Sequence, residues 1–387
     1  MTQPVDSGAR TYRVAILGCR GRGTAAARAY AAHPRTQIVG LCDLVPERLQ
    51  VLGDELGIAA RYDDLDAMIR EQRPDLVAIP TGTEFHHPLA RRVLAHGCHI
   101  DVEKPICTTL EEADDLIQMA GERGLRIAVH HQSRVGRSMR ALREQLRSGA
   151  IGEVRHVQGS CKGYYAGYGM QNIGTHLTNN LMSFLGPCRA VTAVSLTGGR
   201  RSEAENVVVA AGGMGTVLGE RVTATLEFDG GVTSTLLFHR FPRVDNEAYH
   251  FEVLGTEGRL FWKMRGLWRL GIPHFVPGSS AEWESVPIPG LPGFEGETRA
   301  EQDELAYVDD FVTALDTNRA PECSGEAGRH AVEINFGIFE AAAYGRRVTL
   351  PQVDRSHPLL RWRAEQGLGA PAAGPRDYRE WLESVTR

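Results

Sequence analysis

Short apolar runs alternate with amphipathic stretches from Thr11 to about Gln132. The apolar runs predict strands, and the amphipathic stretches predict helices that are apolar on one face. Strands are expected at 13–18, 37–42, 75–80, 98–102 and 125–131, and helices at 23–32, 46–56, 64–72, 86–96 and 109–123. This βα alternation indicates a parallel sheet covered on both faces, in which ligands lie beyond the carboxyl ends of the strands.

The pattern changes after a linking helix expected at 137–148. Later runs are rich in β-branched and aromatic residues, which favours a mostly antiparallel sheet, and Asp229-Gly230-Gly231 predicts a hairpin turn between two of them. The expected strands are 154–159, 191–197, 222–228, 232–239, 251–254 and 259–262, with helices at 173–185, 300–316 and 325–343.

These elements predict an α/β protein with two domains. A doubly wound parallel-sheet domain is expected over residues 11–134, and the returning helix at 325–343 can pack on it. A substrate-binding α/β domain with a large, mostly antiparallel open sheet is expected over 135–350, followed by a C-terminal tail at 351–387.

Three glycines follow the first expected strand. Gly18 suits the tight turn, Gly21 lets the backbone approach a phosphate, and Gly23 lets the next helix pack closely on the strand. That helix would aim its N-terminal amides at the phosphates. The spacing is Gly-x-x-Gly-x-Gly rather than the commoner Gly-x-Gly-x-x-Gly, so the argument depends on its βαβ context.

Asp43 ends the second expected strand and supports a dinucleotide site. A carboxylate there can accept hydrogen bonds from the adenosine ribose hydroxyls, and it would repel the 2′-phosphate of NADP, so NAD is the expected cofactor. Arg20 and Arg22 leave NADP open. Asp43 could instead cap the helix that begins near Pro46.

Composition and charge narrow the class of protein. A chain of 387 residues exceeds what one core usually serves, and a net charge of −5 argues against a nucleic-acid binder. The seven cysteines form no Cys-x-x-Cys pair, which indicates reduced thiols in a cytoplasmic protein and no metal site. The polar N-terminus and the lack of a long apolar run predict neither a signal peptide nor a membrane span.

Glu103-Lys104-Pro105 directly follows the strand expected at 98–102. At that edge of a parallel sheet, the Lys104 amine can sit beside the nicotinamide and the reacting carbinol, with a pKa lowered by desolvation so that it exchanges a proton. Pro105 would fix the turn. The alternative is a surface lysine beside a loop proline.

Asn172 and His176 lie one helical turn apart at the start of an expected helix. A histidine there can share proton transfer with Lys104 or hold a substrate hydroxyl. The alternative is a structural histidine.

In order and spacing, these motifs resemble the Gfo/Idh/MocA family of glucose-fructose oxidoreductases, inositol dehydrogenases and rhizopine catabolism proteins. The resemblance covers roughly residues 12–350 and rests on the glycine loop, Asp43, Thr81 to Ala90, Glu103-Lys104-Pro105, Arg134, and Gly174 to His176. It implies a Rossmann domain that binds NAD or NADP, and a second domain whose open sheet often builds an oligomer interface. We therefore expect a homodimer or homotetramer.

The resemblance also implies roles for single residues. Lys104 matches the catalytic lysine of the family, His176 matches its histidine near the substrate, and His86 matches a histidine close to the cofactor. The expected cofactor-binding residues are Gly18, Arg20, Gly21, Arg22, Gly23, Asp43, Thr81, His86, Glu103 and Lys104. Arg134 and Thr175 are expected to contact the substrate.

The chain departs from the family pattern at Asn172 and Asn179, where acidic residues are common. An amide cannot act as a general base or tune His176 by charge. The family also includes glycosidases that use NAD without net redox change, and these need further acid and base groups. Candidates are Lys162, Tyr164, Tyr165, Tyr168 and His176. Tyr165 is placed among the catalytic residues, and the residues expected to bind the substrate include Lys162, Tyr164, Tyr168 and Asn172.

Three basic side chains at the end of an expected strand, His239, Arg240 and Arg243, complete the candidates. They could hold an anionic substituent of a sugar or be solvated charges at a sheet edge. Three hypotheses stand: an NAD-dependent oxidoreductase acting on a ring hydroxyl of a sugar, sugar acid, cyclitol or glycoside; an NAD-dependent glycosidase; and a non-catalytic nucleotide sensor.

Overall fold

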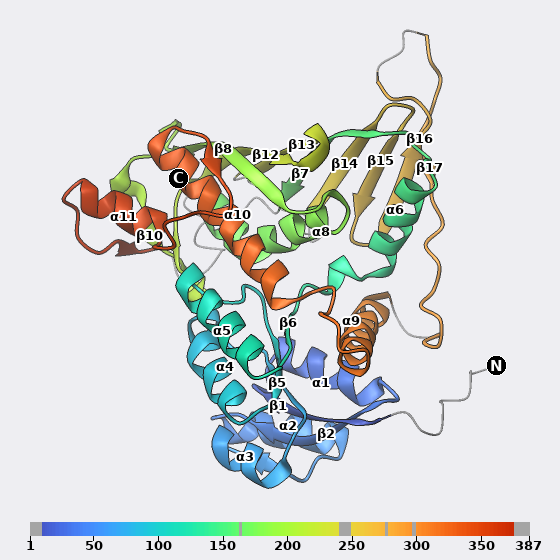
Figure 1. Ribbon diagram of the computed structural model, residues 1–387, viewed down its shortest axis with the longest axis vertical. Coiled ribbons are helices and arrows are strands. Elements are labelled where there is room, and N and C mark those ends of the chain that lie inside the picture. The colour runs from blue at the N-terminus through green and yellow to red at the C-terminus, as the bar shows by residue number, and fades with distance from the viewer. Residues whose placement is uncertain (1–9, 162–164, 240–248, 275–277, 296–298, 375–387) are drawn as a thin grey trace. The chain divides into compact units, whose positions relative to one another are not determined.

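The computed structural model describes residues 10–161, 165–239, 249–274, 278–295 and 299–374 (Figure 1). The chain divides into two compact units. Unit 1 comprises Met1–Cys107, Glu112–Gly136 and Gly290–Arg329, and unit 2 comprises Thr108–Glu111, Arg137–Pro289 and His330–Arg387. Unit 1 therefore includes a late segment, Gly290–Arg329, which follows most of unit 2 along the chain.

Unit 1 is built on a six-stranded sheet in which every strand pairs in parallel. The strand order is β3-β2-β1-β4-β5-β6, the order of a dinucleotide-binding doubly wound sheet. The strands are β1 Tyr12–Leu17, β2 Thr36–Cys42, β3 Arg61–Tyr62, β4 Leu76–Ile79, β5 His99–Val102 and β6 Ile127–Val129. Only the short β3 lacks a counterpart among the expected strands.

The helices of unit 1 begin and end where the sequence provides signals. Asp64 caps α3 by accepting a hydrogen bond from the Ala67 amide at 2.6 Å, and Gly57 ends α2 in the left-handed conformation. The helices are α1 Arg22–Ala32, α2 Pro46–Leu56, α3 Leu65–Gln72, α4 His86–Ala95, α5 Leu110–Glu122, which enters unit 1 at Glu112, and α9 Arg299–Asp316.

Helix α9 completes the core of unit 1. Its residues Tyr307 and Phe311 are buried in the same cluster as Val14 and Ile16 of β1 and Tyr30 of α1. The late segment is therefore an integral part of the apolar core.

Unit 2 is built on a large, mostly antiparallel sheet, in the order β17-β16-β15-β14-β7-β13-β12-β8-β18, with β9 paired to β8. The pair β7 and β13 is parallel. The strands are β7 Val154–Cys161, β8 Cys188–Thr197, β9 Arg200–Arg201, β12 Arg221–Phe228, β13 Thr233–His239, β14 Tyr249–Gly255, β15 Arg259–Lys263, β16 Gly266–Leu270, β17 Glu284–Ser285 and β18 Val348–Thr349. The two sheets confirm the predicted fold class.

One face of this sheet is covered by helices and the other is partly exposed. Phe238 and Leu236 of β13 are fully buried, while Leu237 between them is half-buried, as the period of two in a strand requires. Helices α6 Arg137–Arg147, α7 Ala166–Gly169, α8 Thr175–Leu185 and α10 Gly325–Tyr344, which enters unit 2 at His330, belong wholly or partly to unit 2.

The last described segment contains α11 Pro358–Glu365 and the short strand β19 Ala372–Ala373. Strand β19 joins β10 Val208–Val209 and β11 Thr216–Val217 in a three-stranded sheet. His357 caps α11 by accepting a hydrogen bond from the Leu359 amide at 3.3 Å. Burial lowers the pKa of His357 to about 4, so the ring is neutral at pH 7.

All seven cysteines are buried and reduced, and desolvation raises the pKa of most of these thiols, for example to about 12 at Cys19. Among the described helices, none has the length and apolar character needed to cross a membrane. The described part of the chain also contains no cluster of three or more His, Cys, Asp or Glu side chains that could hold a metal ion.

Candidate functional site

The glycine loop has the close contacts that its sequence implies. Gly18 has φ +110°, and its amide donates to the Cys42 carbonyl at 2.8 Å. A Cβ atom at Gly23 would collide with the Gly18 carbonyl oxygen, so α1 can approach β1 only with glycine there. Gly21 has φ +49° and open space around the position of a Cβ. The loop thus leaves a bare stretch of backbone at the N-terminus of α1.

Asp43 ties this loop to the end of β2. One carboxylate oxygen accepts from the Cys19 amide at 2.8 Å, and the other accepts from the Val45 amide at 2.9 Å. The cap residue of α2 is Val45, so Asp43 braces the loop rather than serving as the N-cap itself. A carboxylate has about four acceptor positions, which leaves capacity for a ligand hydroxyl.

Thr81 supplies an independent indication of a ligand beside the loop. It follows β4, and a Cβ atom at Gly18 would lie 3.5 Å from the Thr81 methyl carbon. Its hydroxyl oxygen is buried and finds no hydrogen-bond partner in the described part of the chain. A buried hydroxyl without a partner is costly, and a dinucleotide on the glycine loop would bring polar atoms to this place. The residues present therefore fit NAD.

Glu103, Lys104 and Pro105 lie beyond the carboxyl end of β5, and the Lys104–Pro105 peptide is cis. One Glu103 oxygen accepts from the Lys104 amide at 3.2 Å. His86 is fully buried beneath this turn, with its ring nitrogens 2.8 Å from the Pro105 carbonyl oxygen and 3.2 Å from that of Thr81. Burial lowers the pKa of His86, and the buried ring lies between the turn and the loop after β4.

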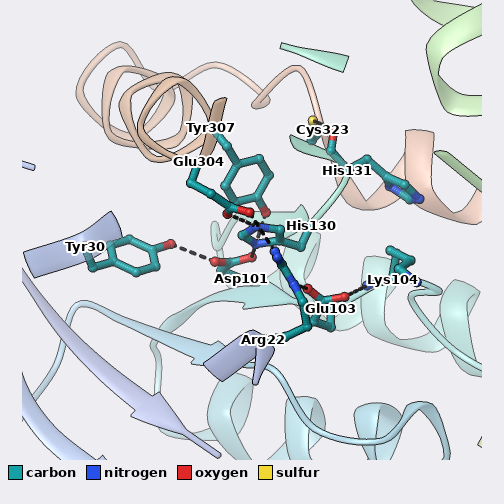
Figure 2. A network of polar contacts seen from close by, with 10 residues as sticks. All are labelled: Arg22, Tyr30, Asp101, Glu103, Lys104, His130, His131, Glu304, Tyr307 and Cys323. Atoms are coloured by element: carbon teal, nitrogen blue, oxygen red, sulfur yellow. Dashed lines mark hydrogen bonds and ion pairs between the residues drawn. The ribbon is translucent and has the colours of Figure 1, made fainter. Parts of the chain in front are cut away.

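A chain of charged groups connects the glycine loop to Glu103 (Figure 2). Arg22, the first residue of α1, donates from Nε to Glu103 at 2.7 Å and from Nη2 to Glu304 of α9 at 3.0 Å. Burial opposes the charge of Arg22, but the two carboxylates outweigh it and raise the pKa of Arg22. Arg22 is thus engaged within the protein, whereas Arg20 is exposed.

The chain of charges continues through His130, directly after β6 (Figure 2). Its Nε2 lies 2.7 Å from a Glu304 oxygen, and its Nδ1 lies 3.3 Å from a carboxylate oxygen of Asp101. Burial disfavours a charged ring, but Glu304 and Asp101 raise the pKa of His130 to about 10. The hydroxyls of Tyr30 and Tyr307 donate to Asp101 at 2.9 and 2.6 Å.

The pKa of His131, the next residue, is shifted in the opposite direction. Burial, followed by the positive charges of Lys104 and Arg134, lowers the pKa of His131 well below its usual value. The charges of two predicted site residues of unit 1, Lys104 and Arg134, thus act on the His131 ring at the carboxyl end of β6.

The predicted residues of unit 2 gather around the start of α8. Helix α7 is followed by one π-helical segment, Met170–Gly174, which leads into α8. Such single π turns interrupt helices frequently at functional sites. His176 is buried and stacks on Tyr249 of β14 with ring centroids 5.9 Å apart.

Further predicted residues lie before His176 along the same segment. The Asn172 amide donates to the Tyr168 hydroxyl at 3.1 Å. Tyr165 is buried at the N-cap of α7. Thr175 is fully buried, and its hydroxyl has no hydrogen-bond partner among the residues that the structure describes. The fully buried Asn179 lies one turn beyond Thr175.

His239 is not brought together with this group. Gly174 packs against the Phe238 ring, so Phe238 faces α8 and the next residue, His239, points to the opposite face of the sheet. There, His239 Nε2 lies 3.1 Å from the Thr223 hydroxyl. Four other candidates, Lys162, Tyr164, Arg240 and Arg243, lie outside the described residues.

Sequence reasoning missed His130, His131 and Glu304. Both histidines close the strand that was expected at 125–131, so their place at the ligand edge of the sheet could have been noticed. Nothing in the sequence marks Glu304, because its partners lie far from it along the chain.

Comparisons with known proteins agree with this geometry. Residues 12–131 match the GFO/IDH/MocA model of an oxidoreductase family with an NAD-binding Rossmann fold, and residues 139–261 match the GFO/IDH/MocA C-terminal domain. A levoglucosan dehydrogenase solved with NADH and levoglucosan has a TM-score of 0.73 at 19% identity, over 89% of this chain and 100% of that one.

The curated relatives include sugar dehydrogenases, reductases and glycosyl hydrolases. The UDP-N-acetylglucosamine 3-dehydrogenase of Acidithiobacillus ferrooxidans is 28% identical over 331 residues, which is 83% of this chain and 94% of that protein. The D-glucoside 3-dehydrogenase of Escherichia coli (strain K12) is 32% identical over 146 residues, which is 37% of this chain and 41% of that protein. A glycosyl hydrolase family 109 protein of Porphyromonas gingivalis is 31% identical over 160 residues, which is 39% of this chain and 34% of that protein.

Proposed function

Because this chain belongs to the Gfo/Idh/MocA family of NAD-binding oxidoreductases, we propose that it is an NAD-dependent enzyme acting on a ring hydroxyl of a sugar, sugar acid, cyclitol or glycoside. The observation that carries the proposal is the placement of the glycine loop, Asp43 and Lys104 at the carboxyl ends of parallel strands of unit 1. The matched dehydrogenases are named for sugar substrates, which supports this substrate class.

The cofactor would supply the hydride acceptor. Asp43 and the glycine loop would hold its adenosine and pyrophosphate, and the Thr81 hydroxyl would gain a partner. NAD is favoured over NADP because Asp43 would repel a 2′-phosphate and because Arg22 is engaged by Glu103 and Glu304.

The substrate proton is assigned to Lys104 and His176. An amine or imidazole can exchange a proton near neutral pH, whereas the Asn172 amide cannot.

Two measurements test the proposal. Fluorescence titration should detect NADH binding to the pure protein, and a panel of free sugars and cyclitols with NAD should give sustained growth of NADH absorbance for at least one of them. Lys104→Ala should retain NADH binding and lose at least a hundredfold in turnover, since positioned general acid–base catalysis contributes about 10²–10⁴-fold. Absence of coenzyme binding, or unchanged turnover in Lys104→Ala, would refute the proposal.

A second candidate is an NAD-dependent glycosidase that oxidises a sugar transiently and returns the hydride. Two observations favour it: the match to a glycosyl hydrolase family 109 protein, and an amide at position 172 where an acidic residue is common in the dehydrogenases. Cleavage of a nitrophenyl glycoside that requires NAD but accumulates no NADH would support the glycosidase. Sustained NADH formation from a free sugar would support the dehydrogenase.

A further inference from the structure

The charged groups between the glycine loop and α9 form one alternating series: Glu103, Arg22, Glu304, His130 and Asp101. All five belong to unit 1, and they come from α1, the ends of β5 and β6, and α9. Except for half-buried Arg22, these residues are nearly or fully buried. The series therefore joins α1, α9 and the ends of β5 and β6.

We propose that Glu304 and His130 are positioning residues, which hold Arg22 and, through it, Glu103 in the geometry that coenzyme and Lys104 require. The inference rests on the proposed function and deepens it by assigning roles to two residues that act on the coenzyme site through Arg22. It concerns how firmly two parts of the coenzyme site are held relative to each other.

The guanidinium of Arg22 explains how this works. Its planar fork binds one carboxylate through Nε and the other through Nη2, so the two glutamates fix both its position and its plane. Arg22 follows the last loop residue before α1, and Glu103 holds the Lys104 amide through its second oxygen at 3.2 Å. The series thus sets the separation between the phosphate-binding backbone and the peptide of Lys104.

Stability alone does not account for this arrangement. Taking charges out of water is costly, and well-packed apolar residues are often as stabilising as a buried ion pair. An apolar cluster of α1, β1 and α9 already holds these elements together. What an ion series adds is a fixed direction for each side chain, which the coenzyme site needs and a core does not.

Positive and negative charges alternate along the series only while the His130 ring is protonated. Without that proton, Glu304 and Asp101 would face each other across a neutral ring, with only Arg22 left to compensate. The ionisable groups in contact with the His130 ring are Asp101 of β5 and Glu304 and Tyr307 of α9. Next to these, Tyr30 of α1 donates to Asp101, Arg22 of α1 donates to Glu304, and His131 is adjacent in the chain.

The decisive variant is Glu304→Gln, which keeps the size of the side chain and removes its charge. Because Glu304 is the strongest of the groups that raise the pKa of His130, the pKa of the ring should fall toward the neutral range in this variant. NADH titrations from pH 6.5 to 9 should then show a dissociation constant raised at least tenfold, and rising further with pH. The wild type should stay level over the same range.

Asp310→Asn is the matched control. Asp310 is a buried carboxylate on the same helix, and it accepts from Arg319 and from the Glu322 amide, so its loss disturbs α9 without touching Arg22 or Glu103. This variant should lower thermal stability, but should bind NADH within twofold of the wild type at every pH.

Each result of these titrations either supports or overturns the inference. Wild-type affinity in Glu304→Gln, or an equal loss in both variants without a new pH dependence, would overturn the inference. If Glu304→Gln does not fold, His130→Gln takes its place, because glutamine can still donate to Glu304 but carries no charge; wild-type affinity there would overturn it equally. If the wild type itself binds no NADH, the proposed function fails, and this inference with it.

Discussion

Replacing Gly23 by alanine tests the central geometric claim about the coenzyme site. A Cβ atom at this position would overlap the Gly18 carbonyl oxygen and lie 2.8 Å from the Gly18 carbonyl carbon and 3.3 Å from Cγ of Pro80. The first two are main-chain atoms, which cannot rotate away. Helix α1 must therefore move off β1, or the glycine loop must open.

The expected size follows from two opposing effects. Alanine is favoured over glycine inside a helix by about 1 kcal/mol, whereas an additional methyl group in a packed core typically costs about 1–3 kcal/mol. Because main-chain atoms are hit, we expect the upper end of that cost and a net loss of about 2 kcal/mol in the free energy of unfolding. Displacement of the α1 amides should also weaken NADH binding at least tenfold.

Gly121 provides the matched control, since it also lies in a helix, α5 of unit 1, but has nothing within 4 Å of its Cβ position. Gly121→Ala should leave NADH affinity unchanged and gain up to about 1 kcal/mol of stability. Urea unfolding and fluorescence titration of both variants provide the comparison. If Gly23→Ala were as stable and bound NADH as tightly as Gly121→Ala, the close packing of the loop described above would be refuted.

Two further variants test single side chains. Asp43→Asn should narrow the preference for NADH over NADPH at least tenfold, because the charge that repels a 2′-phosphate is lost; an unchanged ratio of the two dissociation constants would contradict this role. His357→Asn should make the free energy of unfolding less sensitive to acid. Burial lowers the pKa of His357 to about 4, below the 6.5 of an exposed ring. The contribution of the buried ring to stability is therefore complete above pH 6.5 and is lost as the pH falls toward 4. That loss is worth about 3 kcal/mol at most, and asparagine keeps the cap of α11. Urea unfolding at pH 7 and pH 4.5 should therefore show a smaller drop in the variant than in the wild type, and an equal drop would exclude His357 as its source.

Much of the fold was readable from the hydrophobic pattern, because regular periods mark elements that bury one face. The parallel strands of unit 1 and the hairpin at Asp229-Gly230-Gly231 are examples, and β12 and β13 do pair antiparallel around that turn. The two-residue strand β3 was missed because so short a segment has no period to detect. Nor could local pattern assign α9 to unit 1, since that depends on a core formed with β1 and α1.

The candidate site could be proposed from the sequence where its chemistry lies in short motifs, and not where it depends on distant partners. Gly18, Gly23 and Lys104 stand next to the strands that place them. Glu304 is recognisable only once α9 is packed against α1. His239 is different, because the alternation of Leu236 and Phe238 already assigned it to the other face of its strand.

The late position of α9 has a consequence for synthesis on the ribosome. By the time Gly136 has emerged, all six strands of the unit 1 sheet have been synthesised, yet Tyr307 and Phe311, which cover part of its apolar core, are absent, and Arg22 and His130 lack the carboxylate of Glu304. The apolar core of nascent unit 1 therefore stays incompletely covered while β7 to β17 are translated. Chaperone binding and proteolytic sensitivity should therefore peak in that interval and fall sharply once residue 316 leaves the exit tunnel.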